Sequence, residues 1–367
     1  MAEKIKLGIL FGGRSCEHEV SVTSARSMLA AVNKDKYDVT MIGIDKQGQW
    51  LLAEDARPIL EAGVVESNTL TPVLLNYPGS SQLLSQDPSS TENIAQDLDV
   101  VFPLLHGPYG EDGTMQGLLE LAGVAYVGSG VVGSAVGMDK EMMKRAFRAE
   151  GLQQTKHITV RRQRWQSDSH AVIEEIVSNF EFPLFVKPAN MGSSVGVSKA
   201  HDEFELITGI NTAAEYDYKI IVEASLENCH EVECAVLGNE NPQASVVGEI
   251  LPGNQFYDYQ TKYIDDKTDL IIPAKISKQA SERVREMALE AFRAVEAMGL
   301  ARVDSFVRRG NGDVFVNEIN TMPGFTPISM YPKLWEASGI SYTELIDRLI
   351  ELALERQKDR QNTRSAL

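Results

Sequence analysis

Residues 301–324 read ARVDSFVRRGNGDVFVNEINTMPG. Two runs within this stretch, 301–307 and 313–320, read as strands because Val, Phe and Ile recur along them. The segment between them, 308–312, contains two glycines and reads as a turn-rich connection. The two predicted strands are close enough in sequence to pair as a hairpin.

Oxygen-bearing side chains lie along this candidate hairpin. Glu318 and Asn320 are two positions apart, so they project from the same face of a strand, and Asp304 joins them if the strands pair. Hard oxygen donors that converge without His or Cys suit magnesium, which in proteins often also holds the phosphates of a nucleotide. The alternative is that these side chains lie at a strand end and face water.

Length, composition and charge restrict the class of protein. A chain of 367 residues fits two or three domains, and 43% hydrophobic with 24% charged residues is ordinary for a globular enzyme. The formal net charge of -17 argues against a nucleic-acid surface, which needs clustered Lys and Arg. A few local lysines can still bind a small anionic ligand.

The sequence favours a cytoplasmic protein that does not contact a membrane. Its three cysteines form no metal-binding pattern and leave an odd count, which favours a reducing compartment. The apolar segment 5–11 is short, is interrupted by Lys6 and runs into two glycines, so it does not resemble a targeting signal. No apolar run approaches the roughly 20 residues that a membrane helix needs.

Residues 1–135 are expected to form an α/β unit. Strands are predicted at 4–11, 37–44 and 98–105, with a helix at 20–31. This alternation implies a mainly parallel sheet with helices on its faces. The segment 63–92 is rich in Ser, Pro, Asn and Gln and is interpreted as a surface insertion, with only 71–75 resembling a strand.

The downstream half predicts closely spaced strands and three helices. Strands are expected at 182–188, 219–223, 231–237 and 245–250, a spacing that favours antiparallel pairing. Helices are expected at 139–150 with Asp139 as the cap, at 280–298 with Gly299 as the stop, and after the capping box Ser341 to Glu344. The last helix should bury Leu345, Leu349 and Leu352. The polar tail 356–367 is expected to fray.

The loop Gly192-Ser193-Ser194-Val195-Gly196 is a candidate phosphate-binding element. It follows a predicted strand that contains Lys187, and its backbone N–H groups and Ser hydroxyls can donate to phosphates. The alternative is a plain surface loop, but an almost wholly apolar strand seldom carries a lysine without a partner. The Gly12-Gly13 segment after the first predicted strand lacks the GxGxxG spacing, and GxxxxGK[ST] does not occur in the chain, so a dinucleotide fold and a P-loop are not supported.

Three further segments have both a functional and a structural interpretation. Glu17 begins a predicted helix, where it either interacts with the helix dipole or holds a substrate ammonium group. The loop 107–113 after His106 is either part of a site or a tight structural turn. The aromatic segment 256–263, between Gly253 and Pro273, is either a lid or an edge strand with exposed tyrosines.

In their order along the chain, these motifs resemble the D-alanine–D-alanine ligase family of the ATP-grasp superfamily, over roughly residues 4–355. The residues that carry the resemblance are Gly12-Gly13-x-Ser15-x-Glu17-x-Glu19-Val20-Ser21, His106-Gly107-x-x-Gly110-Glu111-Asp112-Gly113, Met138-Asp139-Lys140, Lys187-Pro188-x-x-x-Gly192-Ser193-Ser194-Val195-Gly196, Tyr257-Asp258-Tyr259-x-x-Lys262-Tyr263, Arg302-Val303-Asp304 and Glu318-x-Asn320-Thr321-x-Pro323-Gly324.

The resemblance implies an α/β fold in which an N-terminal Rossmann-like domain precedes a two-lobed ATP-grasp fold. The implied parts are an N-terminal domain at 1–135, a central lobe at 136–225, and a C-terminal lobe at 226–367 with a lid at about 253–273. It also implies a homodimer that forms through the N-terminal domain.

The resemblance implies a role for each matching residue. ATP would contact Lys140, Lys187, Ser194, Glu223, Glu231, Lys262 and Asn317. Two Mg²⁺ ions, for which Mn²⁺ can substitute, would be held by Asp304, Glu318 and Asn320. Glu17, Ser193, Tyr263, Arg302 and the Gly324 backbone would serve catalysis, and the two D-alanines would contact Glu17, His106, Lys262, Arg302, Ser329 and Met330.

The implied activity is ATP-dependent ligation of two D-alanines through a D-alanyl phosphate, for peptidoglycan synthesis and cell shape. Tyr263 favours an amine as the second nucleophile, although D-lactate or D-serine remain alternatives. A nucleotide-binding regulator without catalysis and a dehydrogenase are the rivals from other classes. Two departures from the family pattern are Ala224, where some members have Lys after the adenine-site Glu, and the segment 63–92, which shorter members lack.

Overall fold

The hairpin expected at residues 301–320 is present in the computed structural model of the chain. β16 (Gly299–Arg308) pairs antiparallel with β17 (Val314–Asn320), and the register sets Asp304 opposite Glu318 and Arg302 opposite Asn320. The polar side chains of the two strands are thereby brought to one place in the sheet.

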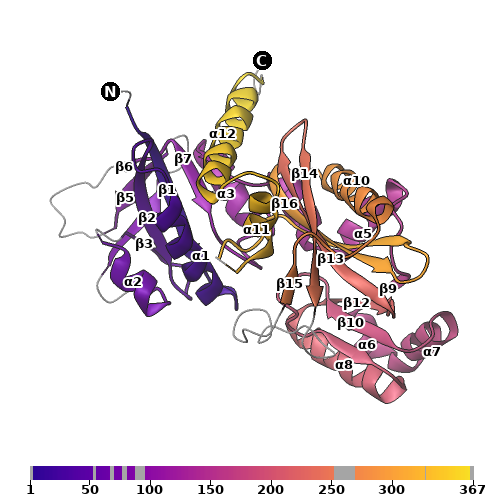
Figure 1. Cartoon of the computed structure of the whole chain (residues 1–367). Helices are drawn as coiled ribbons and strands as arrows, with labels where there is room; N and C mark the ends of the chain where they lie inside the picture. The colour runs from indigo at the N-terminus through magenta and orange to yellow at the C-terminus, as the bar shows by residue number, and fades with distance from the viewer. Residues whose placement is uncertain are drawn as a thin grey trace.

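The fold is mixed α/β and contains three sheets (Figure 1). The structure describes residues 3–52, 55–66, 70–76, 81–86, 96–251, 269–326 and 328–363. The lid expected at 256–263 lies outside the described residues. Within those ranges, no helix combines the length and the apolar character needed to cross a membrane.

The first sheet has eight strands in the order β6-β5-β4-β3-β2-β1-β7-β8. Its strands are β1 (Ile5–Gly12), β2 (Tyr37–Ile44), β3 (Trp50–Leu52), β4 (Thr71–Leu75), β5 (Gln82–Ser85), β6 (Gln96–Asp97), β7 (Val100–Pro103) and β8 (Ala125–Tyr126). The helices of this unit are α1 (His18–Ala31), α2 (Arg57–Ala62) and α3 (Thr114–Ala122). The strands and the first helix predicted here are therefore confirmed to within a few residues.

The expectation of a mainly parallel sheet is only half right. β2, β1, β7 and β8 pair in parallel, but β3 to β6 are added in antiparallel fashion on the side of β2. Segment 63–92 is not simply a surface insertion, because β4 and β5 extend the sheet and bury Val73, Leu75 and Leu83. Short strands such as β5 have too few apolar residues for a periodicity to be recognised.

The second sheet is antiparallel with the order β11-β10-β12-β9. It follows α4 (Val131–Met138) and α5 (Lys140–Ala149), and Asp139 caps α5 as expected. Its elements are β9 (His157–Arg161), α6 (Arg162–Ser167), α7 (Ser169–Asn179), β10 (Leu184–Pro188), β11 (Ser198–Ala200), α8 (Glu203–Tyr216) and β12 (Lys219–Ala224). Figure 1 shows this sheet with α6, α7 and α8 at the far end of the molecule from the first sheet.

The third sheet contains the hairpin and has the order β15-β14-β13-β16-β17. Its other strands are β13 (Cys229–Gly238), β14 (Gln243–Leu251) and β15 (Asp269–Ile271), and α10 (Lys278–Ala294) packs on one face. α10 is shorter than the expected helix 280–298. It ends at Ala294 because Glu296 takes a left-handed backbone conformation with φ of 58°.

The chain ends with α11 (Met330–Ala337) and α12 (Tyr342–Gln361), which return to the first unit (Figure 1). Leu345 and Leu349 of α12 are buried in one core with residues of β1 and β7, whereas Leu352 is only half-buried. The expectation that residues 356–367 fray is wrong for the first part. Arg356 lies within α12 and donates hydrogen bonds to the carbonyl oxygens of Tyr126 and Gly128.

Candidate active site

A cavity of about 420 Å³ lies where residues of the three sheets meet. Its walls come from the loops after β1 and β7, from β10 and the loop that follows it, and from β12, β13, β16 and β17. The predicted site residues that line it are Glu17, His106, Lys140, Lys187, Ser193, Ser194, Glu223, Glu231, Arg302, Asp304, Asn317, Glu318, Asn320 and Gly324.

Four predicted residues are not among the residues that line the cavity. Lys262 and Tyr263 lie outside the described residues. Met330 is the first residue of α11 and is buried, with its sulfur close to Gly248 of β14. Ser329 lies next to Gly324, which lines the cavity: a Cβ placed on Gly324 would lie 2.9 Å from the Ser329 Oγ.

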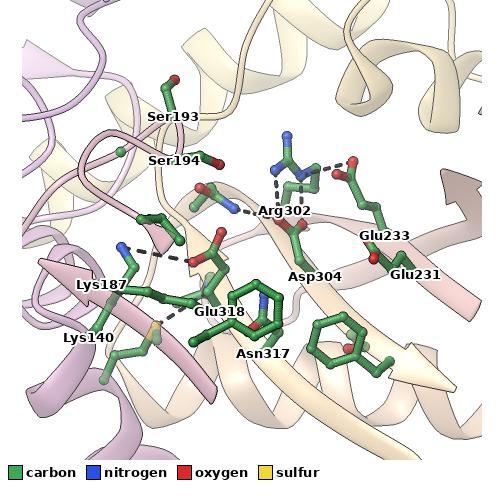
Figure 2. Close-up of a pocket in the computed structure, with 18 of the residues that line it drawn as sticks. Lys140, Lys187, Ser193, Ser194, Glu231, Glu233, Arg302, Asp304, Asn317 and Glu318 are labelled. Atoms are coloured by element: carbon green, nitrogen blue, oxygen red, sulfur yellow. Dashed lines mark hydrogen bonds and ion pairs between the residues drawn. The ribbon is translucent and has the colours of Figure 1, made fainter. Parts of the chain in front are cut away.

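Arg302 is the centre of the charged cluster on the third sheet (Figure 2). Its guanidinium donates to both carboxylate oxygens of Asp304 at 2.7 Å, and its Nε also lies 3.0 Å from a carboxylate oxygen of Glu233. The amide of Asn320 donates to Asp304 at 3.1 Å. β13 brings Glu233 opposite Asp304 in the sheet, so three neighbouring strands fix this arrangement. The sequence analysis missed Glu233, because nothing in the sequence of this strand indicated which cation it would pair with.

A β-bulge places Asn317 at the cavity. The register sets Glu318 opposite Asp304 but Val316 opposite Ser305, so Asn317 is an extra residue on β17. Bulges re-aim side chains and are frequent next to binding sites. In the unbulged part of the strand Glu318 and Asn320 both line the cavity, in agreement with the prediction that they share one face.

Two lysines share one buried glutamate under the cavity. Lys187 Nζ lies 2.9 Å from one carboxylate oxygen of Glu223, and Lys144 Nζ lies 2.9 Å from the other. Burial alone would raise the pKa of Glu223, but the two ammonium groups outweigh it and hold that pKa well below its usual range. Burial lowers the pKa of Lys144, whereas Glu223 and Glu318 outweigh burial at Lys187 and raise its pKa.

Lys144 is a further residue that the sequence reasoning missed. Its side chain is only 1% exposed, and Nζ approaches the carbonyl oxygen of Asn317 at 3.5 Å. The available signal was helical spacing: Lys144 lies four positions after Lys140 and on the buried face that includes Met143 and Phe147. A lysine on the apolar face of a helix needs a buried partner.

Lys140 contacts both the Gly/Ser loop and the hairpin. It is the first residue of α5, whose N-cap is Asp139. Its Nζ donates to the carbonyl oxygen of Met191 at 2.8 Å and lies 3.9 Å from Glu318 (Figure 2). This single cation therefore faces both predicted phosphate-binding and metal-binding groups.

Glu17 lies against the loop that was expected to bind phosphates. The Ser193 hydroxyl donates a hydrogen bond to its carboxylate. The other carboxylate oxygen packs against two glycines: a Cβ on Gly107 or Gly192 would lie 2.7 or 2.6 Å from it. A side chain at either position would require the Glu17 carboxylate to move. The structure thus joins the start of α1 to the Gly/Ser loop across a long sequence separation.

His106 and Glu111 both contact the backbone of Met322. His106 Nδ1 lies 3.0 Å from the Met322 carbonyl oxygen, so Nδ1 carries the hydrogen. Burial lowers the pKa of His106, which keeps the ring neutral. The two oxygens of Glu111 accept hydrogen bonds from the N–H groups of Gly107 at 2.7 Å and Met322 at 3.0 Å. Burial raises the pKa of Glu111 to about 8, and the nearby Glu17 adds to the rise.

The oxygen donors fit magnesium that is shared with phosphates. Among the described residues, no three His, Cys, Asp or Glu side chains form a ready metal cluster. The hairpin instead offers two carboxylates, Asp304 and Glu318, and the amide of Asn320. Magnesium is usually held by one or two carboxylates together with water and substrate phosphates. Two carboxylates and an amide are therefore enough protein ligands for magnesium that also binds phosphates.

Comparisons with known proteins agree over nearly the whole chain. Two family models match, "D-ala D-ala ligase N-terminus" over residues 6–129 and "D-ala D-ala ligase C-terminus" over residues 146–351. A D-alanine–D-alanine ligase from Natranaerobius thermophilus is 48% identical over 363 residues, which cover 98% of both chains.

Two solved structures are similar in fold as well as sequence. The D-alanine–D-alanine ligase of Coxiella burnetii has a TM-score of 0.84 at 35% identity, and the match covers 98% of this chain and 97% of that chain. The VanG D-Ala:D-Ser ligase of Enterococcus faecalis has a TM-score of 0.85 at 35% identity, and the match covers 96% of this chain and 100% of that one.

Proposed function

Because the chain belongs to the D-alanine–D-alanine ligase family, we propose that it joins two D-alanine molecules into D-alanyl-D-alanine while ATP becomes ADP and phosphate. The product is a building block of peptidoglycan. One observation carries the proposal: a single cavity contains the lysines Lys140 and Lys187, the carboxylates Asp304 and Glu318, and Arg302.

The three-sheet arrangement supports a division into three parts. The N-terminal Rossmann-like domain would span 1–135, and the central and C-terminal lobes of an ATP-grasp fold would span 136–225 and 226–367. In this arrangement ATP lies between the second and third sheets, where the cavity is. The segment 253–273 would then be the lid that closes over it.

The first step would activate one D-alanine. Its carboxylate attacks the γ-phosphorus of ATP, ADP departs, and D-alanyl phosphate forms. Lys140 and Lys187 line the cavity and would offset the negative charge of the phosphoryl oxygens. Glu17, which Ser193 and two glycines hold in place, would bind the ammonium group of this D-alanine.

The second step would form the peptide bond. The amine of the second D-alanine, having lost a proton, attacks the acyl carbon, and phosphate leaves with the electron pair of the broken C–O bond. The negative charge that develops on the carbonyl oxygen needs preorganised donors. Arg302 and the N–H of Gly324 both line the cavity and can supply them.

Magnesium would be held by Asp304, Glu318 and Asn320, as two ions that Mn²⁺ can replace. The metal would supply charge neutralisation on the β- and γ-phosphates. Arg302 contacts Glu233 as well as Asp304, so it keeps a carboxylate partner when Asp304 binds another cation.

The second substrate is the least determined part of the proposal. A close structural neighbour is a D-Ala:D-Ser ligase, so the fold by itself does not distinguish D-alanine from D-serine. Tyr263, which favours an amine nucleophile, lies outside the described residues. D-Serine and D-lactate are therefore the competitors to test.

The deciding experiment is mass spectrometry of the products from ATP, Mg²⁺ and D-alanine, with L-alanine as the control. D-Alanyl-D-alanine should form together with equimolar ADP, and L-alanine should give neither. In mixtures, D-alanine should be preferred over D-serine and D-lactate near neutral pH. ATP binding without ADP formation would instead indicate a nucleotide-binding regulator.

Replacement of Glu318 tests the metal assignment. Glu318→Ala removes one of two carboxylates that face the phosphates, so dipeptide formation should fall by more than about 100-fold. The melting temperature should change little, because Glu318 is partly exposed at the cavity. Turnover should be measured across a Mg²⁺ titration, and an active variant with an unchanged Mg²⁺ dependence would refute the assignment.

The remaining expectations concern the cellular compartment and the oligomeric state. We propose a cytoplasmic enzyme that acts as a homodimer through its N-terminal domain, with ATP and D-alanine as its small-molecule partners and with no role for nucleic acid or membrane. The net charge of -17 supports the exclusion of nucleic acid. Light scattering would report the oligomeric state directly.

A further inference from the structure

The backbone of residues 322–325 is held at both ends by side chains from elsewhere in the chain. Met322 donates its N–H to Glu111 at 3.0 Å, and its carbonyl oxygen accepts from His106 at 3.0 Å. At the other end, the Phe325 N–H donates to Ser24 Oγ at 3.4 Å, and the Phe325 carbonyl oxygen accepts from the Tyr342 hydroxyl at 2.8 Å.

These contacts leave the Gly324 N–H available. Gly324 lies between the two anchored residues and lines the cavity. In the part of the chain that the structure describes, its N–H has no hydrogen-bond partner. A fixed peptide on each side with a free donor between them is the arrangement that a preorganised oxyanion site requires.

Among the four anchoring residues, Glu111 accepts from backbone N–H groups on both of its side-chain oxygens, one from each part of the molecule. One of its oxygens accepts from Gly107 in its own loop, and the other accepts from Met322, 211 positions later. It therefore fixes the position of the C-terminal segment relative to the N-terminal loop that also packs on Glu17.

We propose that Glu111 is a positioning residue that aims the Gly324 N–H at the carbonyl oxygen of the acyl phosphate. The inference rests on the proposed function and adds a residue that does not touch the reacting atoms. A carboxyl group has two oxygens, each of which can accept from an N–H group, whereas an amide offers only one oxygen for them.

Glu111 lines the cavity, and its two hydrogen bonds hold its carboxyl group in place. The charged groups that act on it are the Glu17 carboxylate and, more weakly, the Arg302 guanidinium, and His106 contacts the same Met322 backbone. No cation among the described residues pairs with it directly; its two hydrogen bonds come from the backbone. A buried carboxylate next to a like charge is unfavourable for folding, and such groups concentrate at functional sites.

The variant Glu111→Gln tests the proposal. It keeps the shape but presents an NH₂ group to one of the two N–H donors, so Met322 should shift. The rate of dipeptide formation should fall about 10- to 100-fold, as expected for a donor misplaced by about 1 Å. The KM for ATP should stay within about twofold of the wild-type value, because the nucleotide contacts are on other elements.

The decisive readout is the ratio of phosphate released to dipeptide formed. An acyl phosphate can lose its phosphate to water by cleavage of the P–O bond, which needs no donor at the carbonyl oxygen. If the second step alone is slowed, this ratio should rise from about one to at least three. A variant that is merely less well folded would lower both products together.

Asp112→Asn is the matched control. Asp112 is the next residue, and it accepts hydrogen bonds from the Tyr109 and Thr114 N–H groups within its own loop. This variant should keep the wild-type ratio. Glu111→Asp retains the carboxyl group but is too short to reach both donors, so it should raise the ratio as Glu111→Gln does. It replaces Glu111→Gln in the experiment if that variant does not fold.

The outcomes separate the two proposals. Failure of the wild-type protein to form dipeptide would refute the proposed function. If the wild-type protein forms dipeptide, an unchanged ratio in both Glu111 variants would overturn the positioning role, whatever their overall rate. A raised ratio in Asp112→Asn would overturn it as well, since loop integrity would then be the cause.

Discussion

At the residue scale, the buried trio Lys144, Glu223 and Lys187 determines how the phosphate-binding lysine is held. Glu223 is 3% exposed and contacts both lysines at 2.9 Å. Removal of one member of a buried ion pair leaves uncompensated charge, which usually costs more than the pair contributes when intact.

Lys144→Met should therefore lower the free energy of unfolding by about 3 kcal/mol, at the lower end of the range for a broken buried pair, because Lys187 remains on Glu223. Urea denaturation checks this value. Lys278→Met is the control, since the Lys278 side chain is 92% exposed and, among the described residues, pairs only with Glu282 on the same helix. A loss no larger than in the control would mean that Lys144 is not an essential partner of Glu223.

Glu111 gives the protein a pH dependence of known sign. Its pKa is about 8 in the folded protein and 4.5 as a reference in the unfolded chain. The folded state therefore binds the proton more tightly, and this contribution to stability is complete below pH 4.5 and is lost as the pH rises to 8.

Relative to Glu111→Gln, the wild-type protein should become less stable between pH 5 and pH 8, by roughly 1–4 kcal/mol. Urea midpoints at several pH values, with the variant as reference, measure this difference. A difference that does not change with pH, or that grows in the opposite direction, would show that the Glu111 carboxyl titrates in its ordinary range.

The sequence reveals site residues when they share an element and conceals them when they do not. Glu318 and Asn320 were found because a strand repeats every two residues, and Asp304 because its strand is the other half of the hairpin. Glu233 and Lys144 were not found, and Glu111 was named in a motif but given no role, because each is identified by a partner that the fold brings close.

At the scale of elements, the Gly/Ser loop after β10 depends on close approach to the start of α1. Ser193 and Ser194 have left-handed backbone conformations, with φ of 47° and 58°, and Gly192 leaves room for the Glu17 carboxylate. Backbone strain at non-glycine residues is tolerated where function requires it.

Gly192→Ala should separate this loop from Glu17, because the added Cβ would lie 2.6 Å from a carboxylate oxygen. The kcat/KM for D-alanine should fall about 10- to 100-fold, as expected when a substrate-binding group moves by about 1 Å. Gly117→Ala in α3, where the Cβ meets no atom within 4 Å, is the control and should retain full activity. Steady-state kinetics of the two variants and the wild-type protein measure this effect. If Gly192→Ala had the same kcat/KM as the control, the loop would not need its contact with Glu17.

Elements were predicted well where a hydrophobic pattern extends over many residues and poorly where the element is short. β1, β2, β7 and the hairpin contain enough apolar residues to be recognised. The strands β5 and β6 have four and two residues, and their pairing partners rather than their composition make them strands. The end of α10 was misplaced because Val295 and Met298 continue the helical spacing after the backbone has turned.

At the scale of the whole molecule, α12 joins the end of the chain to its beginning. Leu345, Ile346, Leu349 and Ile350 share a core with residues of β1 and β7. Arg356 stacks on the Tyr126 ring at 4.2 Å and donates to two backbone carbonyl groups. The sequence predicted the helix but not its docking, since a basic residue near a chain terminus normally faces water.

Arg356→Met should lower the free energy of unfolding by about 1–3 kcal/mol, because two carbonyl groups lose their donor. Arg348→Met is the matched control: the Arg348 side chain is 41% exposed and, in the part of the chain that the structure describes, pairs only with Glu344, so its loss should cost less than about 0.5 kcal/mol. Thermal denaturation of both variants makes the comparison, and equal stabilities would show that α12 is held by its apolar face alone.

The position of α12 has a consequence for the synthesis of the protein. β8 ends at residue 126 and α12 begins at 342, so 342 − 126 = 216 positions separate the sheet from the helix that covers it. At about 5–20 residues per second, a nascent chain carries that uncovered apolar face for roughly 10–40 s. A chain that is cut short before residue 342 would keep this apolar face uncovered, so variants truncated within α12 should aggregate or be degraded faster than the full sequence.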